Sequence, residues 1–226
     1  MASIAQVREC IELQNTMNNI VNPQWKTAMY RWDRAALVEA VECMDHIGWK
    51  WWKKQDINRE QAFIELVDIF HFLLSYYLIR GRITPELVIN AYEHANKKIH
   101  RNKDKEYVLT QLETFIECVV EKDIPIDRFF NVLVSLNYTL DDLVKYYIGK
   151  NVLNQFRQAN GYKEGTYIKN WSTPEELASG VDIEDNVILE EILQKTPIIS
   201  FALIKQELSD YYHQVQNKFV SVTAVK

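Results

Sequence analysis

Glycine and proline are scarce in this sequence, which contains six glycines and five prolines among 226 residues. Average usage of the two residues together is about 12%, so the chain holds few of the residues that interrupt regular backbone. This scarcity argues against a loop-rich chain and favours one that is mostly helical. The hydrophobic fraction of 47%, with 12% aromatic residues, supplies enough apolar side chain for a core and excludes a disordered chain.

Cysteine and net positive charge are also lacking. The three cysteines, Cys10, Cys43 and Cys118, form an odd and widely spaced set that fits neither a disulfide framework nor a zinc-binding pattern. We therefore expect a reducing compartment, namely the cytoplasm (or that of a host cell if the protein is viral). The net charge of −5 excludes a strongly basic surface, so no nucleic-acid partner is expected.

The longest apolar run carries ionisable residues. Residues 63–79 are long enough to suggest a membrane span, yet Glu65, Asp68 and His71 lie near the middle, where such groups are costly in lipid. We therefore expect no membrane partner. The first residues, MASIAQVRECIELQ, place an arginine and two glutamates before any apolar run, which predicts that there is no signal peptide.

Two pairs of acidic residues dominate the chemistry of the sequence: Glu39 with Glu42, and Glu65 with Asp68. Residues three apart lie on one face of a helix. In the apolar segment 61–79 the polar residues follow the helical period and form a narrow stripe, which consists of Gln61, Glu65, Asp68, His71 and Ser75. Buried carboxylates are costly unless a positive charge meets them. We therefore predict that the two pairs face each other on neighbouring helices and hold metal cations.

The ligand type indicates which metal. Four carboxylates suit Mg²⁺, or Mn²⁺, rather than zinc, and their crowded charge predicts two or more ions per site. A diiron carboxylate bundle is the rival interpretation, but it requires two Glu-x-x-His motifs. The nearest matches are Asp68 with His71 and the differently spaced Glu42 with His46, so the diiron interpretation is disfavoured.

Helices are expected over most of the chain, at about 3–20, 34–47, 61–80, from 85 onward, 107–121, 125–136, 139–160, 184–195 and 198–217. The second of these has an apolar stripe of Leu37, Val38, Val41 and Met44. Gly48, Gly81 and Gly161 are expected to end helices, and Thr84 and Thr139 to begin them. We expect one all-α catalytic domain over 1–226, with 81–137 as a cap or insertion and 172–226 as a C-terminal helical extension.

Cationic and amide residues gather downstream, where Lys150, Asn154, Arg157 and Gln158 share one helix face. Such a face is either an anion site, since arginine offers a fork for phosphate oxygens and lysine a point charge, or an ordinary solvated surface. Combined with metals, an anion site implies displacement at phosphorus. Two other groups are ambiguous. Gln14 and Asn18 lie one helical turn apart, and we interpret them as a solvated helix edge. The aromatic segment 49–54 is interpreted as part of the core, with a base-stacking platform as the less favoured interpretation.

Several motifs together resemble the dimeric dUTPase (dUTPase/dCTPase) family of all-α nucleoside triphosphate pyrophosphatases. Besides the acid pairs, the matching segments are 13–18, 49–53, 64–72, 147–163 and 165–169. The resemblance implies a homodimeric helical bundle, with a metal site between two helices, that hydrolyses dUTP to dUMP and diphosphate by Mg²⁺-assisted water attack. It also implies that dUDP is a substrate. Met17, His46 and Phe70 depart from the residues common in the family, and the two departures near the base pocket leave the choice between dUTP and dCTP open.

The resemblance also implies roles for individual residues. Glu39, Glu42, Glu65 and Asp68 would bind metal, and Glu39 would also orient or deprotonate the attacking water. The base and deoxyribose would contact Gln14, Asn18, His71 and Phe72, with Trp49 and Trp52 as walls. The phosphates would be held, from one or both subunits, by Lys53, Lys150, Asn154, Arg157, Tyr162, Lys163 and Lys169. The alternatives are a pyrophosphatase for dCTP or another dNTP, and a non-catalytic helical module that binds nucleotide or metal.

Overall fold

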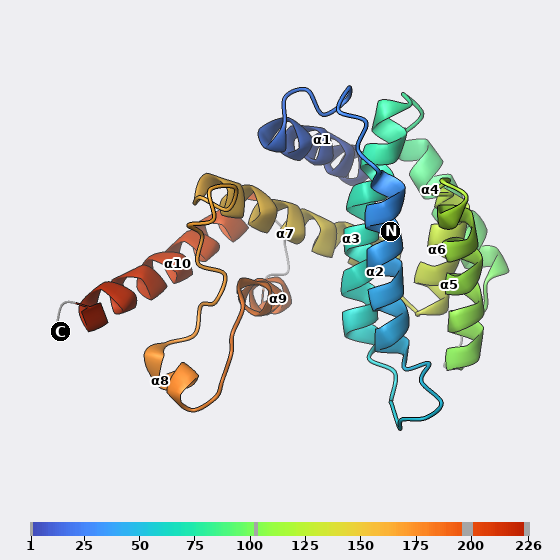
Figure 1. The fold of residues 1–226 in the computed structure, drawn as a ribbon. Coiled ribbons are helices and arrows are strands. Elements are labelled where there is room, and N and C mark those ends of the chain that lie inside the picture. The colour runs from blue at the N-terminus through green and yellow to red at the C-terminus, as the bar shows by residue number, and fades with distance from the viewer. Residues whose placement is uncertain (1, 102–103, 196–200, 224–226) are drawn as a thin grey trace. The chain divides into compact units, whose positions relative to one another are not determined.

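The computed structural model describes residues 2–101, 104–195 and 201–223, and in that part of the chain the regular elements are all helices (Figure 1). The predicted all-α class is confirmed. The chain forms two compact units, Met1–Tyr147 and Ile148–Lys226. The helices are α1 (Ile4–Val21), α2 (Trp32–Ile47), α3 (Arg59–Ile79), α4 (Pro85–Lys98), α5 (Lys105–Val120), α6 (Ile126–Ser135), α7 (Leu140–Ala159), α8 (Pro174–Ala178), α9 (Asp185–Lys195) and α10 (Phe201–Thr223).

Most of the predicted helices agree with these bounds to within a few residues, because local signals fix their ends, but α10 continues to Thr223, beyond its predicted end at about residue 217. Gly48 ends α2 at φ +80°, and a Cβ there would lie 2.9 Å from the Cβ of Gln55. The hydroxyl of Thr84 accepts a hydrogen bond from the N–H of Leu87 at the start of α4. The short helix α8 was not predicted. The expected helix over 198–217 is α10, but residues 198–200 lie outside the described residues.

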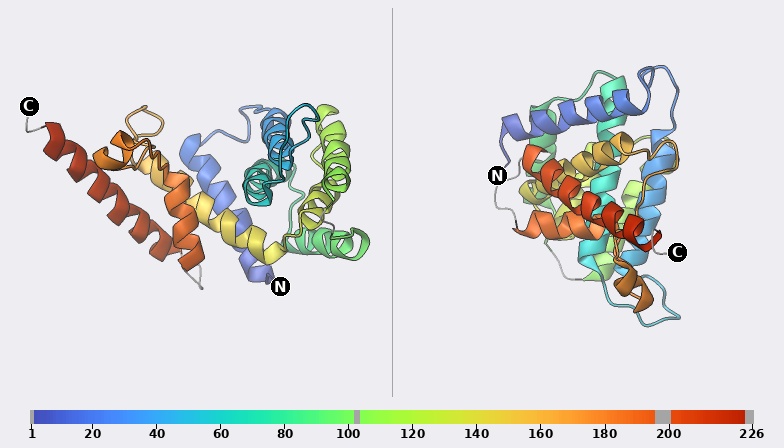
Figure 2. Two further views of the ribbon diagram at one scale, coloured as in Figure 1. Left: turned by 90° about the horizontal axis from the view of Figure 1, so that it is seen from below. Right: turned by 90° about the vertical axis from the view of Figure 1, so that its left-hand side faces the viewer.

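The first unit is built around α3, which packs along α2 and also contacts α1 and α6. Figure 1 shows α2 and α3 side by side, joined by the loop at residues 48–58, and the view from below in Figure 2 shows both nearly end-on with the green α5 beside them. Aromatic rings fill the interior. Phe70 stacks on Phe129 with centroids 5.5 Å apart, and Phe63 stacks on Tyr138 at 3.9 Å.

The buried face of α2 differs from the expected one. Val38 and Val41 of the predicted stripe are 54% and 52% exposed, so the prediction was wrong for them. The fully buried residues of α2 are instead Ala36, Ala40, Cys43 and Ile47. Both sets follow the helical period, and the small alanine side chains allow α2 to approach its neighbours more closely than the valines would.

The middle region contributes to the same core. Helix α6 packs on both α4 and α5, and α5 packs on α2. Phe115, Phe129 and Phe130 of this region are completely buried. The role of 81–137 as a cap over a site stays a prediction.

Helix α3 is, among the described helices, the one with the length and apolar composition to cross a membrane. Its most apolar 18-residue window is 61% buried inside the protein. The core helix of a folded domain meets the same criteria of length and composition.

The second unit comprises the last part of α7 with α8, α9 and α10. Helix α9 lies close to α7 at Gly149, where a Cβ would come within 2.8 Å of the side chain of Leu193. An aromatic cluster forms the rest of the core: Tyr167 stacks on Tyr212 at 5.3 Å, and Phe156 meets the same ring edge-on at 5.4 Å.

Candidate metal centre and nucleotide-binding residues

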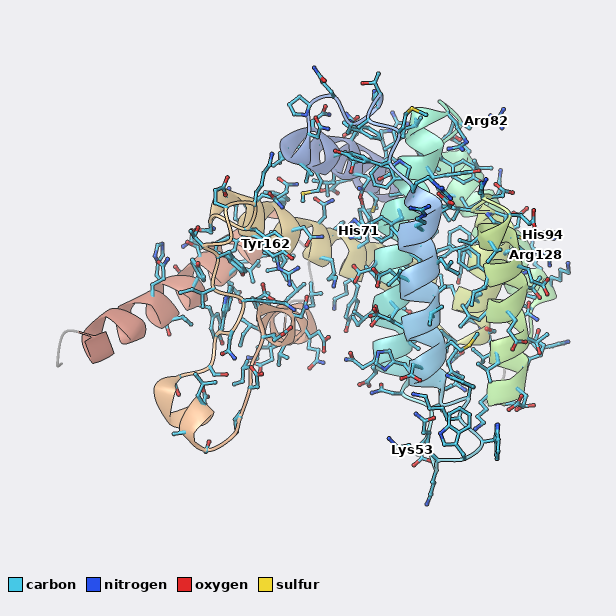
Figure 3. All side chains as sticks on the ribbon, in the orientation of Figure 1. Lys53, His71, Arg82, His94, Arg128 and Tyr162 are labelled. Carbon is cyan, nitrogen blue, oxygen red and sulfur yellow. The ribbon has the colours of Figure 1, made fainter. Side chains whose placement is uncertain are left out.

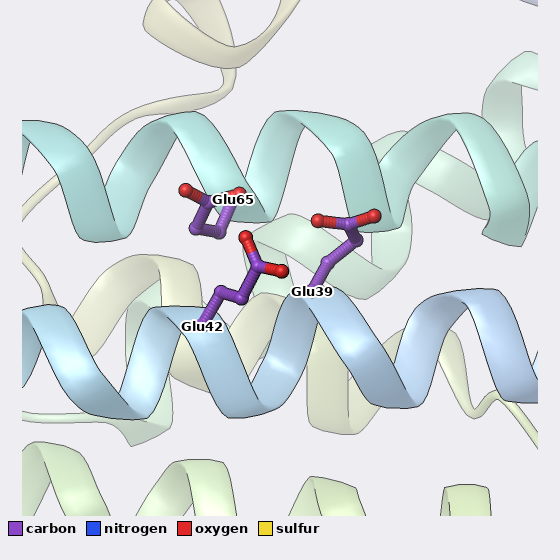
Figure 4. Close-up of side chains that lie close together, drawn as sticks. All are labelled: Glu39, Glu42 and Glu65. Atoms are coloured by element: carbon purple, nitrogen blue, oxygen red, sulfur yellow. The ribbon is translucent and has the colours of Figure 1, made fainter.

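Three carboxylates meet between α2 and α3. Glu39 and Glu42 project from α2 and Glu65 from α3, and each offers an oxygen within 4.8 Å of the other two (Figure 4). Glu39 and Glu65 are half-buried and Glu42 is exposed. Carboxylates this close repel one another unless a cation or proton lies among them. An all-oxygen set of this kind suits a hard divalent cation.

The fourth predicted ligand lies outside this group. Asp68 follows Glu65 by one turn of α3 and is half-buried, but it does not belong to the three-carboxylate cluster. Its role as a metal ligand stays a prediction.

Two further residues of α2 adjoin the cluster. Nε2 of His46 lies 3.3 Å from Oε1 of Glu65. Cys43 is completely buried, and this burial, together with the negative charge of Glu65, raises the pKa of its thiol. The groups that adjoin one another here are thus the oxygens of the three carboxylates and the imidazole of His46.

A buried polar network lies further along α3. The hydroxyl of Ser75 accepts hydrogen bonds from Nε2 of Gln14 at 3.0 Å and from Nδ2 of Asn18 at 2.9 Å, and donates to the carbonyl of His71 at 2.9 Å. Gln14 and Asn18 are only 4% and 7% exposed, so the expectation of a solvated edge was wrong. The alternation of polar and apolar residues in α1 could not show that its polar edge faces the polar stripe of α3.

The same network orients the predicted base-contacting residues. Oε1 of Gln14 lies 2.8 Å from Nδ1 of His71 and accepts a hydrogen bond from the hydroxyl of Tyr147 at 2.7 Å. Figure 3 labels His71 on α3. Phe72 is half-buried and its ring lies 6.3 Å from that of Trp32.

The aromatic loop after α2 is exposed. Trp49 and Trp52 are 41% and 57% exposed and pack edge to face at 5.2 Å, so the interpretation of this segment as core was wrong. Lys53 is exposed in the same loop, as Figure 3 shows. The loop therefore presents aromatic faces and cations together.

The basic face of α7 is largely committed to protein partners. Arg157 binds Asp185 through Nε at 2.8 Å and through a terminal nitrogen at 2.7 Å, and its other terminal nitrogen donates to Asn154 at 3.3 Å. The hydroxyl of Tyr167 also donates to Asp185, at 2.7 Å. Because the Arg157 side chain is only 11% exposed, an ordinary solvated face is excluded for it.

The other predicted phosphate-binding residues fall into two groups. Lys150 is buried and donates to Asn186 at 3.4 Å, and Lys169 forms an exposed ion pair with Glu184 at 2.8 Å. Tyr162 and Lys163 are exposed in the loop after α7, and Figure 3 labels Tyr162 there. Residues 184–186 thus contact several of the predicted phosphate-binding side chains.

That loop depends on one glycine. Gly161 has φ +89°, a conformation that favours glycine, and a Cβ there would lie 2.0 Å from Oγ1 of Thr166. The carbonyl of Gly161 accepts hydrogen bonds from the N–H groups of Thr166 and Tyr167. The tight turn presents Tyr162 and Lys163 at its tip.

Sequence reasoning assigned no functional role to Ser75, Tyr147, His46 or Asp185. Ser75 belonged to the recognised polar stripe of α3, and His46 lies one turn after Glu42, so both had a local signal. Asp185 had none, because its partner Arg157 lies 28 residues earlier in the chain.

Comparison with known protein families gives one match. The sequence model of the family described as dUTPase matches residues 6–162, which is more than half of the chain. The matched range contains both acid pairs, the buried network of α1 and α3, and α7. No curated protein matches this chain significantly.

Proposed function

The chain belongs to the dUTPase family of all-α hydrolases, and from this membership and its carboxylate cluster we propose that it is a Mg²⁺-dependent dUTP diphosphatase. It would hydrolyse dUTP to dUMP and diphosphate, and also accept dUDP. We further propose that it acts in the cytoplasm as a homodimer. The observation that carries the proposal is the meeting of Glu39, Glu42 and Glu65 between α2 and α3.

The metal site is assigned to these three residues and Asp68, with two or more Mg²⁺ ions, or Mn²⁺, as the cofactor. Such ions polarise phosphoryl oxygens and lower the pKa of bound water. Glu39 is assigned the further role of orienting or deprotonating the attacking water. Its carboxylate suits that role because it is half-buried and belongs to the cluster.

The base and deoxyribose are assigned to the polar network and its aromatic neighbours. Asn18 and Gln14 carry amide groups that can read the edge of a pyrimidine, and His71 is held by its bond to Gln14. Phe72, Trp49 and Trp52 supply apolar walls. The present bonds of Gln14 show no preference between uracil and cytosine, so a dCTP-directed enzyme is the second candidate.

The phosphates are assigned to Lys53 and to the residues of the second unit. Tyr162, Lys163 and Lys169 are exposed and can bind phosphate at little cost, because an exposed ion pair such as that of Lys169 contributes about 0–1 kcal/mol. Arg157 would first have to leave a buried carboxylate. We therefore expect the exposed loop residues to contact the phosphates directly, and Lys150, Asn154 and Arg157 to support them.

The decisive experiment measures diphosphate release from dUTP, dCTP, dTTP and UTP by the full-length protein, with Mg²⁺, with Mn²⁺ and with a chelator. We expect turnover of dUTP that requires the metal. Absence of dUTP hydrolysis at micromolar enzyme would overturn the proposal, and dUTP binding without hydrolysis would identify a non-catalytic binding module. A higher kcat/KM for dCTP would overturn the choice of substrate alone.

The role of Glu39 is tested by Glu39→Gln, which keeps the shape and removes the charge. We expect kcat to fall by roughly 10²–10⁴-fold, the usual contribution of a general base. Glu113→Gln, an exposed glutamate of α5, is the matched control and should retain the wild-type rate. A wild-type rate for Glu39→Gln would show that another group activates the water.

A further inference from the structure

A cavity of about 330 Å³ lies in the first unit, and no residue of the carboxylate cluster lines it. Its wall is formed by the connection between α1 and α2, by the end of α3 and by Lys122 in the turn between α5 and α6. None of the residues assigned above to metal, base or phosphate lines it. Small-molecule pockets span about 300–1,000 Å³, so this one would hold a small ligand.

The lining is positively charged on a chain whose net charge is −5. Arg31 is neutralised by Asp33, which accepts two hydrogen bonds from its Nε. Lys26 and Lys122 have no ion-pair partner among the residues that the structure describes. Asp123, the residue after Lys122, accepts a hydrogen bond from the hydroxyl of Tyr76 at 2.8 Å.

A third cation on the wall has a fixed position. The guanidinium carbon of Arg80 lies 3.4 Å from the centroid of the Tyr76 ring, and one of its terminal nitrogens donates to the Tyr76 carbonyl at 2.9 Å. A guanidinium has five N–H donors. Arg80 therefore keeps donors for a ligand while its orientation is set, an arrangement that suits phosphate oxygens.

The lining also contains aromatic rings. Tyr30 and Trp32 pack edge to face with centroids 5.5 Å apart. The indole nitrogen of Trp32 is buried and makes no hydrogen bond. Cations and aromatic rings thus line one cavity.

We propose that this cavity is a second ligand site, which binds a nucleoside monophosphate. Lys26, Arg80 and Lys122 hold its phosphate, and its base lies against the rings of Tyr30 and Trp32. Inorganic phosphate would leave the aromatic wall unused, and the volume is small for a dinucleotide. The proposal concerns binding only and does not depend on dUTP hydrolysis.

The test uses the ¹H–¹⁵N signals of the indole groups in the full-length protein, without divalent metal. The chain has six tryptophans, and Trp32→Phe assigns the signal of Trp32. We titrate dUMP and AMP, with inorganic phosphate and deoxyuridine as the separate halves of the ligand. At least one nucleotide should shift the Trp32 signal at a lower concentration than either half. Signals of Trp49 and Trp52 report the proposed catalytic site independently.

The double variant Lys26→Glu, Lys122→Glu separates this site from the catalytic one. It should weaken the nucleotide effect on Trp32 by about tenfold or more, while the response of Trp49 and Trp52 is kept. Lys97→Glu, Lys98→Glu, two exposed lysines of α4, is the matched control and should behave as wild type. A Trp32 signal that no nucleotide moves, or that moves equally in the double variant, would overturn the proposal, whatever the dUTP assay shows.

Discussion

Both carboxylate oxygens of Asp185 accept hydrogen bonds from the guanidinium of Arg157, at 2.7 Å and 2.8 Å, and the Asp185 side chain has no solvent exposure. Burial alone would lower the pKa of Arg157, but the hydrogen bonds and charge of Asp185 outweigh it and raise that pKa. The pair is therefore charged. It ties the start of α9 to α7 within the second unit.

Removal of the acid should destabilise the protein strongly. Asp185→Ala leaves a buried guanidinium without its counter-charge, and breaking such a pair costs about 3–5 kcal/mol. Urea unfolding followed by circular dichroism measures the change. Glu191→Ala is the matched control, because it breaks an exposed pair with Lys195 on the same helix and should cost less than about 1 kcal/mol. Equal losses for the two variants would contradict a charged buried pair.

The helix that carries Arg157 could be predicted from the sequence, but the partner of Arg157 could not. The helix α7 was predictable because its first turn carries a capping box: Thr139 and Asp142 exchange hydrogen bonds of 2.8 Å and 3.1 Å, as the residue spacing indicates. The partner of Arg157 was not predictable, because it depends on how α9 packs on α7. A basic face therefore resembled a free anion site, whereas Arg157 is bound to Asp185.

The acid pairs show the opposite case. The spacing predicted that the two acid pairs would face each other from neighbouring helices; Glu39, Glu42 and Glu65 do meet, whereas Asp68 lies outside their cluster. The rotation of α2 about its axis was not predictable, since the alanine and valine faces both follow the helical period. Packing against α3 and α5 decides between them, which is why Val38 and Val41 are exposed.

Ser75 should be essential to the buried network. Ser75→Ala removes the hydroxyl that accepts hydrogen bonds from Gln14 and Asn18. Leaving a buried amide donor unsatisfied lowers the free energy of unfolding by about 1–3 kcal/mol. We expect a loss of stability in that range and a raised KM for dUTP, because the amides lose their orientation. Thr110→Ala is the control: its exposed hydroxyl bonds only the carbonyl of Glu106, so stability should change little. Unfolding and steady-state kinetics provide both readouts.

Two glycines of one loop allow a matched comparison. Gly161→Ala must relieve a 2.0 Å clash with Thr166 in addition to adopting a positive φ, whereas Gly165 has φ +71° and nothing within 4 Å of the added Cβ. Gly165→Ala should therefore lower the free energy of unfolding only by the cost of a positive φ at alanine, about 1–2 kcal/mol. Gly161→Ala should lower it clearly more. The second change Thr166→Ala, which removes Oγ1, should restore part of the stability. Equal effects of the two alanines would contradict the steric explanation.

Tyr167 should make stability depend on alkaline pH. Burial, followed by the charge of Asp185 and the hydrogen bond to it, raises the pKa of this hydroxyl above its ordinary value of 10.0. A group with a raised pKa in the folded state contributes its full stability below the unfolded pKa and loses it as the pH rises toward the folded one. The free energy of unfolding should therefore fall above pH 10 more steeply in the wild type than in Tyr167→Phe.

Urea unfolding from pH 7 to pH 11 measures the difference in the free energy of unfolding between the two proteins. This difference should be constant below about pH 9 and shrink above pH 10. A difference that does not change with pH would show that the hydroxyl titrates equally in both states.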